Sequence, residues 1–200
     1  WWRQWYFNQG PYGIFFENGL IGSLSHDGTN AYFVDDLAVP PHPQQIQQFG
    51  MNGQQMLFTP FQEGVYHSKL IAVNMETGKL IWKAGGRSSG APAGGGPAVQ
   101  ETAATLLSDC HFLGTPLPLA GKLYVLIEKQ PPGPPEQGLY LVCLDPTKIT
   151  NAPRGEGGLD TPSAYPELLW YQPLGTPNTA APMDTWRRIQ GVNLAYGDGI

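Results

Sequence analysis

Short runs of apolar residues alternate along the chain with residues that favour turns. The apolar runs of the first half lie at 21–25, 31–34, 69–74 and 80–82. Asp27-Gly28 follows the first run, and Glu76-Thr77-Gly78-Lys79 precedes the last. Gly accepts the positive φ that a tight hairpin turn requires, so runs bounded in this way are typical of β-strands. The pattern therefore predicts four short strands in the first half of the chain.

The second half repeats this order. Its apolar runs lie at 116–119, 123–127, 139–145 and 168–171, with a turn at Ala120-Gly121. Tyr32 and Tyr124 stand in the second strands, and Trp82 and Trp170 stand in the fourth strands. Recurring units of four strands are typical of propeller blades. We expect both Trp side chains to be buried at equivalent positions. Two unrelated meanders in a β-sandwich are the alternative.

Composition favours the same fold class. The 200 residues include 26 Gly and 20 Pro, and only 14% are charged, against a usual share of about 25%. A long amphipathic helix needs a charged outer face, so a helical bundle is disfavoured. The apolar runs alternate poorly, which fits strands covered on both faces. The chain is expected to be all-β, a β-propeller segment of about two four-stranded blades plus part of a flanking blade.

The predicted layout is one partial propeller domain over residues 1–200. Its parts are a blade at 20–84 with a long loop at 38–67, a linker at 85–110, a blade at 111–173 with insertions at 129–137 and 146–166, and the start of a next blade at 187–200. Long loops are often functional, and in repeat proteins they supply binding surfaces. Propellers use about four to eight blades. Further blades of a longer polypeptide, or another chain, are therefore expected to complete this one.

Residues 72–82 carry a recognisable motif. They read Ala-Val-Asn-Met-Glu-Thr-Gly-Lys-Leu-Ile-Trp. This resembles the blade motif of pyrroloquinoline-quinone-type β-propellers, which runs Ala, any residue, Asp, three positions, Gly, Lys, two positions, Trp. The resemblance implies that Gly78 makes the turn and that Trp82 docks between blades, with Asn74 in place of the Asp. In the second copy Asp145 and Trp170 match the motif, and the Gly-Lys turn is lost to the insertion.

Two longer stretches have a narrower resemblance. Residues 15–37 and 112–124, which include Ser23-Leu24-Ser25-His26-Asp27-Gly28 and Phe112-Leu113-Gly114-Thr115-Pro116, look like large quinoprotein-like propeller proteins of planctomycete bacteria. That resemblance implies a bacterial protein of the periplasm or cell envelope. It implies no activity.

The resemblance raises the possibility of quinone chemistry. Dehydrogenases of this fold hold the quinone above a Trp with a calcium ion, and many have adjacent cysteines. Cys110 and Cys143 are not adjacent. Asp35-Asp36 could supply oxygen ligands, but neighbours on a strand point to opposite faces, so capping of a strand-end turn is the simpler interpretation. We expect no catalytic, cofactor-binding or metal-binding residues, and pyrroloquinoline quinone and calcium only if the chain is a dehydrogenase segment.

Other classes find little support. The G-x-S-x-G pattern at 86–90 is followed by Ala-Pro-Ala-Gly-Gly-Gly-Pro, which cannot form the helix of a nucleophile elbow. A net charge of −5 without a basic cluster argues against nucleic-acid binding. No apolar run is long enough for a transmembrane helix. Whether the two cysteines pair is open.

These observations predict a non-catalytic β-propeller scaffold or protein-interaction module. Its partners would be proteins or the remaining blades, and its blade-docking residues would be Trp82, Trp170, Gly78, Asn74, Asp145, Tyr32 and Tyr124. A segment of a quinone-dependent alcohol or sugar dehydrogenase is the first alternative. A carbohydrate-binding propeller is the second.

Overall fold

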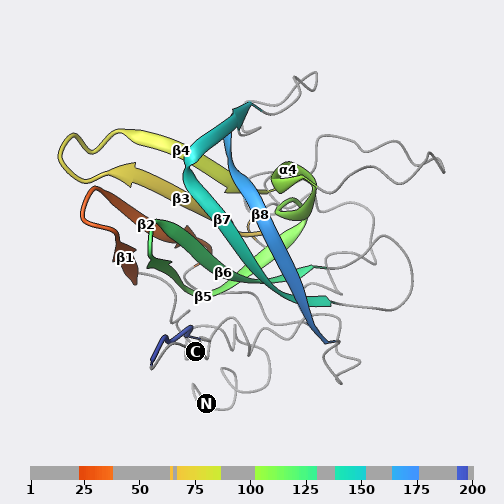
Figure 1. Cartoon of the computed structure of the whole chain (residues 1–200). Helices are drawn as coiled ribbons and strands as arrows, with labels where there is room; N and C mark the ends of the chain where they lie inside the picture. Colours follow the sequence, from red (N-terminus) through yellow and green to blue (C-terminus); the bar gives the residue numbers. More distant parts are fainter. Residues whose placement is uncertain are drawn as a thin grey trace, which may run out of the picture.

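The computed structural model describes residues 23–37, 64, 67–86, 102–129, 138–151, 164–175 and 193–197. Within them the chain forms two four-stranded antiparallel sheets, each a meander in which strands adjacent in sequence pair (Figure 1). The first sheet comprises β1 (Leu24–His26), β2 (Asn30–Asp35), β3 (Lys69–Asn74) and β4 (Leu80–Gly85). The second comprises β5 (Cys110–Leu119), β6 (Lys122–Lys129), β7 (Gly138–Asn151) and β8 (Ala164–Gly175). The all-β prediction is confirmed.

The turns follow from local chemistry. In the β1–β2 hairpin the Asp27 carboxylate accepts hydrogen bonds from the main-chain N–H groups of Thr29 and Asn30, at 2.8 and 2.7 Å. Gly28 has φ +95° and Gly78 has φ +66°, the left-handed region that glycine enters without a steric penalty. Both turns therefore form where the sequence predicts them.

Three features differ from the sequence prediction. β7 and β8 extend into the expected insertion at 146–166, where Ile149 pairs with Pro166 and Thr150 pairs with Tyr165. Part of the inserted sequence thus lengthens a hairpin. The expected linker at 85–110 contains a one-turn helix, α4 (Ala103–Leu106), capped by Thr102 and Thr105. Residues 193–197, expected to open a further blade, form no strand.

Prolines sit where a strand tolerates them. Pro116 and Pro118 lie in β5, and Pro166 and Pro173 lie in β8, which are the two edge strands of the second sheet. Pro146 lies in β7 within the irregularity between Asp145 and Ile149. Proline has no N–H to donate, so edge strands and bulges are the places that accept it. This explains how a Pro-rich chain builds long strands.

The sheets stack on each other through opposite faces. We call the side of the first sheet that bears Tyr32 its front, and the side of the second sheet that bears Tyr124 its front. The front of the first sheet comprises Tyr32, Val34, Leu70, Ala72, Trp82 and Ala84, and all are buried. They share one core cluster with the back of the second sheet, which comprises Leu123, Val125, Ile127, Val142 and Leu144. The core therefore lies between a front face and a back face.

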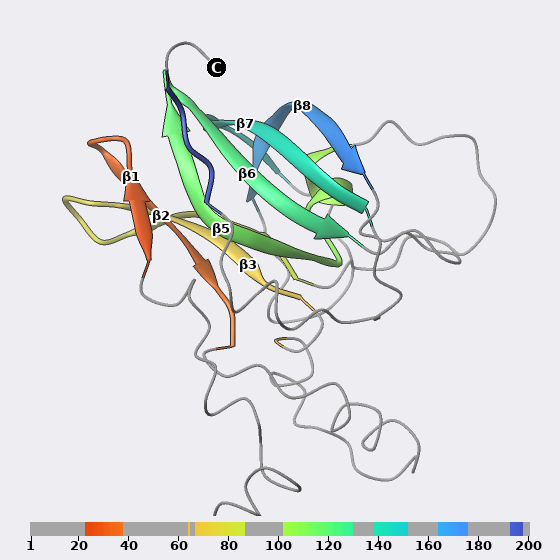
Figure 2. The same cartoon turned by 90° about the horizontal axis from the view of Figure 1, so that it is seen from below.

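Strand contacts fix the orientation of this stack. β5 lies against β1 and β2, and β8 lies against β4. Figure 2 shows the same stack from below, with β5 and β6 beside β1 and β2. Stacked in this way, the second sheet contacts all four strands of the first.

Main-chain hydrogen bonds join the two sheets at one end. The buried Ser68 hydroxyl accepts from the Phe112 N–H at 2.7 Å, and the Ser68 N–H donates to the Cys110 carbonyl at 3.2 Å. Gly86 donates to the Ser68 carbonyl at 3.3 Å, and Asp109 donates to the Gly86 carbonyl at 2.8 Å. This inter-sheet clamp connects the edges of β3 and β4 to the start of β5, so the sheets hold a defined angle.

Candidate docking surface

Each sheet carries a matched row of three side chains across its second, third and fourth strands. The aromatic rows are Tyr32–Ala72–Trp82 in the first sheet and Tyr124–Cys143–Trp170 in the second. The Tyr and Trp ring centroids are 6.0 Å apart in both rows, with interplanar angles of 33° and 60°. The structure thus places the four aromatic residues that the repeat predicts at equivalent register positions, as one Tyr–Trp pair in each sheet.

The first row is sealed. Tyr32 is fully buried and Trp82 is 2% exposed. The Trp82 indole N–H donates to the Pro146 carbonyl of the second sheet at 3.1 Å, so the polar atom of the ring is satisfied inside the core. The prediction that Trp82 is buried is confirmed, and the cover is the neighbouring sheet.

The hydroxyl of Tyr32 reaches the β1–β2 turn. It donates to the second carboxylate oxygen of Asp27 at 2.7 Å. Burial alone would raise the pKa of Asp27, but hydrogen bonds from Asn30, Tyr32 and Thr29 outweigh it and lower that pKa. Burial and the bond to Asp27 together raise the pKa of Tyr32. At neutral pH the Tyr32 hydroxyl is therefore protonated and donates to an ionised Asp27 carboxylate.

The second row is open. Trp170 is 43% exposed, Tyr124 is half-buried, and Cys143 beneath them is fully buried. The prediction that Trp170 is buried is wrong for the described residues, because the second sheet meets the first with its back and turns this row outward. Leu126 and Leu141 belong to the same front face.

The segment 193–197 lies near one end of this face. Figure 2 shows it running along β5 and β6. Burial raises the pKa of Tyr124, and Cys143 and Tyr196 raise it further by their electrostatic interaction. Tyr196 itself is 55% exposed. The segment therefore approaches the Tyr124 end of the row, and the Trp170 end stays open.

Asn74 and Asp145 occupy matched strand positions. The side-chain oxygen of Asn74 accepts from the N–H and hydroxyl of Thr77 at 2.9 and 2.8 Å. A side-chain oxygen of Asp145 accepts hydrogen bonds from the N–H and hydroxyl of Thr147 at 3.0 and 2.6 Å. The bond from the hydroxyl is the largest cause of the lowered pKa of Asp145. Gly78 donates its N–H to the Asn74 carbonyl. All three residues therefore use their polar atoms in hydrogen bonds that stabilise turns or bends of the chain.

The Asp36 carboxylate and the two cysteine thiols, which are the candidate reactive groups, also have structural roles. Asp36 accepts a hydrogen bond from the Leu37 N–H at 2.8 Å, as expected of a strand-end cap. Cys110 and Cys143 are both buried free thiols, and burial raises the pKa of Cys110 to about 12. Across the ranges that the structure describes, no group of three or more His, Cys, Asp or Glu could hold a metal ion. Gly86 opens the G-x-S-x-G pattern, and its serines lie outside the described residues.

A shallow groove of about 430 Å³ separates the β1–β2 turn from the β5–β6 turn. Its lining residues are His26, Asp27, Gly28 and residues 118–122. Both oxygens of Asp27 already accept hydrogen bonds from the β1–β2 hairpin. The groove is therefore a gap between two hairpins, and its Asp27 carboxylate is already hydrogen-bonded within the protein.

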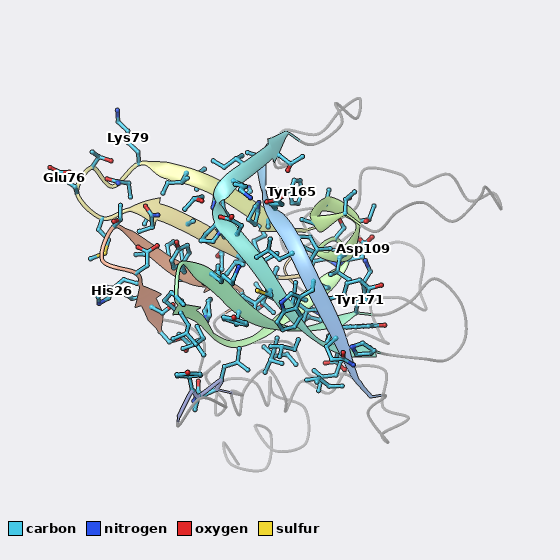
Figure 3. All side chains as sticks on the ribbon, viewed as in Figure 1. His26, Glu76, Lys79, Asp109, Tyr165 and Tyr171 are labelled. Carbon is cyan, nitrogen blue, oxygen red and sulfur yellow. The ribbon has the colours of Figure 1, made fainter. Side chains whose placement is uncertain are left out.

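Two participants were not predicted from the sequence. Pro146 supplies the carbonyl that accepts the Trp82 hydrogen bond, whereas the sequence predicts only an insertion beginning at this position. Tyr171, labelled in Figure 3, is 39% exposed on the back side of β8 and makes an edge contact with Tyr140 at 6.2 Å. The adjacent pair Trp170-Tyr171 was the available signal, because neighbours on a strand face opposite ways.

Comparisons with known proteins add no relative. No protein-family model, curated protein or solved structure matches the chain. Among the described residues no helix has the length and hydropathy needed to span a membrane.

Proposed function

We propose that this chain forms part of a β-propeller and serves as a non-catalytic scaffold or protein-interaction module. The observation that carries the proposal is the direction of stacking. The Tyr32–Trp82 row faces the second sheet, whereas the equivalent Tyr124–Trp170 row faces away from the first. Successive units are thus related front to back, as in a stack that can continue.

This direction of stacking favours a propeller over a β-sandwich. In a sandwich, two sheets share a core between their two inner faces and leave both outer faces to solvent. Here the outward front of the second sheet is still apolar, with Leu126 and Cys143 buried and Trp170 exposed. An apolar outer face fits a unit that has a neighbour on each side.

A scaffold role is supported by what the polar side chains do. Asp27, Asp36, Asn74 and Asp145 all accept main-chain N–H bonds in turns or at strand ends. Several large apolar and aromatic side chains are exposed as well, including Trp170, Tyr171 and Leu174 on β8. Aromatic side chains that are partly exposed are the usual anchors of protein interfaces.

A structure of the purified native assembly tests the architecture. We expect further four-stranded sheets arranged with these two about a common axis, each front face covered by the next back face. A closed two-sheet sandwich with the Trp170 face in solvent would contradict the proposal.

A separate assay tests the absence of catalysis. Purified protein is mixed with pyrroloquinoline quinone and calcium, and dye-linked oxidation of alcohols and aldoses is measured. We expect no turnover above a heat-denatured control. Sustained turnover would favour the quinone-dependent dehydrogenase.

A further inference from the structure

We infer that the front of the second sheet binds the back of the first sheet in a second copy of this chain. This inference rests on the proposed function, because it takes the stacking of the two sheets as the template for contact between chains. The occupant is a second copy, since the chain itself presents the complementary face.

The two back faces share an apolar centre. The back of the first sheet bears Ala31, Phe33, Ile71 and Val73, which are half-buried, and Lys69 and Lys83 stand on the same face beside them. Within the described residues no other strand packs on that face, because the main contacts of the first sheet with other elements are to β5 and β8. Its centre is thus an apolar patch like the one that covers Trp82, bordered on one side by the two lysines.

Register positions match as well. Phe33 follows Tyr32 as Val125 follows Tyr124, and Val73 precedes Asn74 as Leu144 precedes Asp145. Val125 and Leu144 are core residues of the existing interface. Phe33 and Val73 therefore stand where a second copy would need its contact residues.

The hydrogen bond of Trp82 also has a counterpart. Its acceptor, Pro146, directly follows Asp145. The residue that follows Asn74 is Met75, which is 50% exposed and whose N–H is held by the Thr29 carbonyl at 2.9 Å. The Met75 carbonyl of the second copy is thus the acceptor for the Trp170 indole N–H.

Such a contact is head to tail, because it joins two different faces. The pair as a whole keeps one unused front and one unused back, so copies add in one direction until the rotation closes a ring. The segment 193–197 runs along β5 and β6 (Figure 2), so the second copy gains most from Trp170 and its neighbours at the other edge of the sheet.

Sedimentation equilibrium over a concentration series tests the inference on the purified chain. We expect wild type to associate and Trp170→Ala to weaken association at least tenfold. Tyr171→Ala is the matched control, since it removes a similarly exposed ring, 39% against 43%, from the other side of the same strand. Trp170→Phe keeps an aromatic ring but removes the N–H together with part of the indole, and is expected to weaken association at least tenfold, which is the effect of one hydrogen bond plus some contact area.

Mixing two variants tests the direction. Phe33→Ser damages only the back and Trp170→Ala damages only the front, so each alone is expected to associate at least tenfold more weakly than wild type. Mixed, they should form a one-to-one dimer through the intact front of the first variant and the intact back of the second. Circular dichroism of each variant checks that it is folded, and Val73→Ser replaces Phe33→Ser if the latter is not.

Two outcomes overturn the inference: a wild-type chain that stays monomeric at every concentration, or folded variants that fail to restore a dimer on mixing. A monomer in solution leaves the proposed function standing if the native assembly still shows sheets about an axis. The two proposals therefore fail on different measurements.

Discussion

The two sheets follow the same path, pair their strands in the same order and carry the same aromatic row, yet their Trp side chains differ in environment. Trp82 is 2% exposed and bonded through its N–H, whereas Trp170 is 43% exposed. The difference lies in what covers each row. Burial of a repeated Trp is thus a property of the neighbouring unit, and a repeat position alone does not determine how much that residue stabilises the fold.

Truncation of the two Trp side chains should give the largest difference in stability between the two sheets. Trp82→Ala is expected to lower the free energy of unfolding by about 3–5 kcal/mol, the usual cost of removing a large aromatic from a core. Trp170→Ala should cost less than about 1 kcal/mol in dilute, monomeric protein. Urea denaturation followed by circular dichroism measures both. Equal losses would mean that coverage by the second sheet does not stabilise Trp82.

Glycines that end the fourth strands extend the comparison. Gly85 and Gly175 have φ of +100° and +125°. A Cβ at Gly85 would lie 2.5 Å from the Ser68 carbonyl and 2.8 Å from Phe112, whereas one at Gly175 meets nothing within 4 Å. Gly85→Ala should therefore cost about 2–4 kcal/mol from strain and overlap, and Gly175→Ala about 1–2 kcal/mol from strain alone. Thermal melts of the two variants give the order, and the reverse order would exclude the inter-sheet clamp as the cause.

Removal of the two Tyr hydroxyls should give a smaller, pH-dependent difference. Tyr32→Phe loses the bond to Asp27 and is expected to cost about 1 kcal/mol at pH 7, whereas Tyr124→Phe should be nearly neutral. The pKa of Asp27 is lowered by folding, so its stabilisation is present above its ordinary value of 3.8 and is lost as pH falls through the lower folded value. The difference between wild type and Tyr32→Phe should therefore shrink in acid. A difference that stays constant from pH 7 to the acid limit would show that Asp27 is not the partner.

The smallest expected effect concerns thiol reactivity. Burial raises the pKa of both Cys110 and Cys143, so both should react slowly with a thiol reagent at pH 8. Trp170→Ala uncovers the surface above Cys143 and should accelerate labelling of that residue only. Mass spectrometry after timed labelling identifies the modified thiol. Acceleration at Cys110 instead would indicate global loosening.

Much of the fold could be predicted from the sequence, because short apolar runs and Gly-containing turns are local signals. The strand at 69–74, the turn at Gly78 and the placing of Tyr32 in a second strand all follow from such signals. The helix α4 could not be predicted, since four residues are too few for a helical period and its cap uses Thr105 in place of Glu or Gln. Pro146 and Pro166 hid the extension of the β7–β8 hairpin, since proline ordinarily argues against strand.

The site was less predictable than the fold. Trp82 and Trp170 both follow two apolar residues in a fourth strand, but their exposure depends on contacts between units that no local pattern encodes. The inter-sheet clamp is equally hidden, because the Ser68 hydroxyl meets the Phe112 N–H across 44 positions of sequence. The position of each Trp in its sheet was therefore predictable, and its neighbour was not.

The connections between the middle strands have a consequence for the order of folding. Residues 36–68 join β2 to β3, and residues 130–137 join β6 to β7. A connection about four times longer raises the entropic cost of closing the hairpin by roughly 1 kcal/mol. The second sheet is therefore expected to form first, although its residues are synthesised later. Trp82 then finds its acceptor on a surface that already exists, and the first sheet completes its structure on the second.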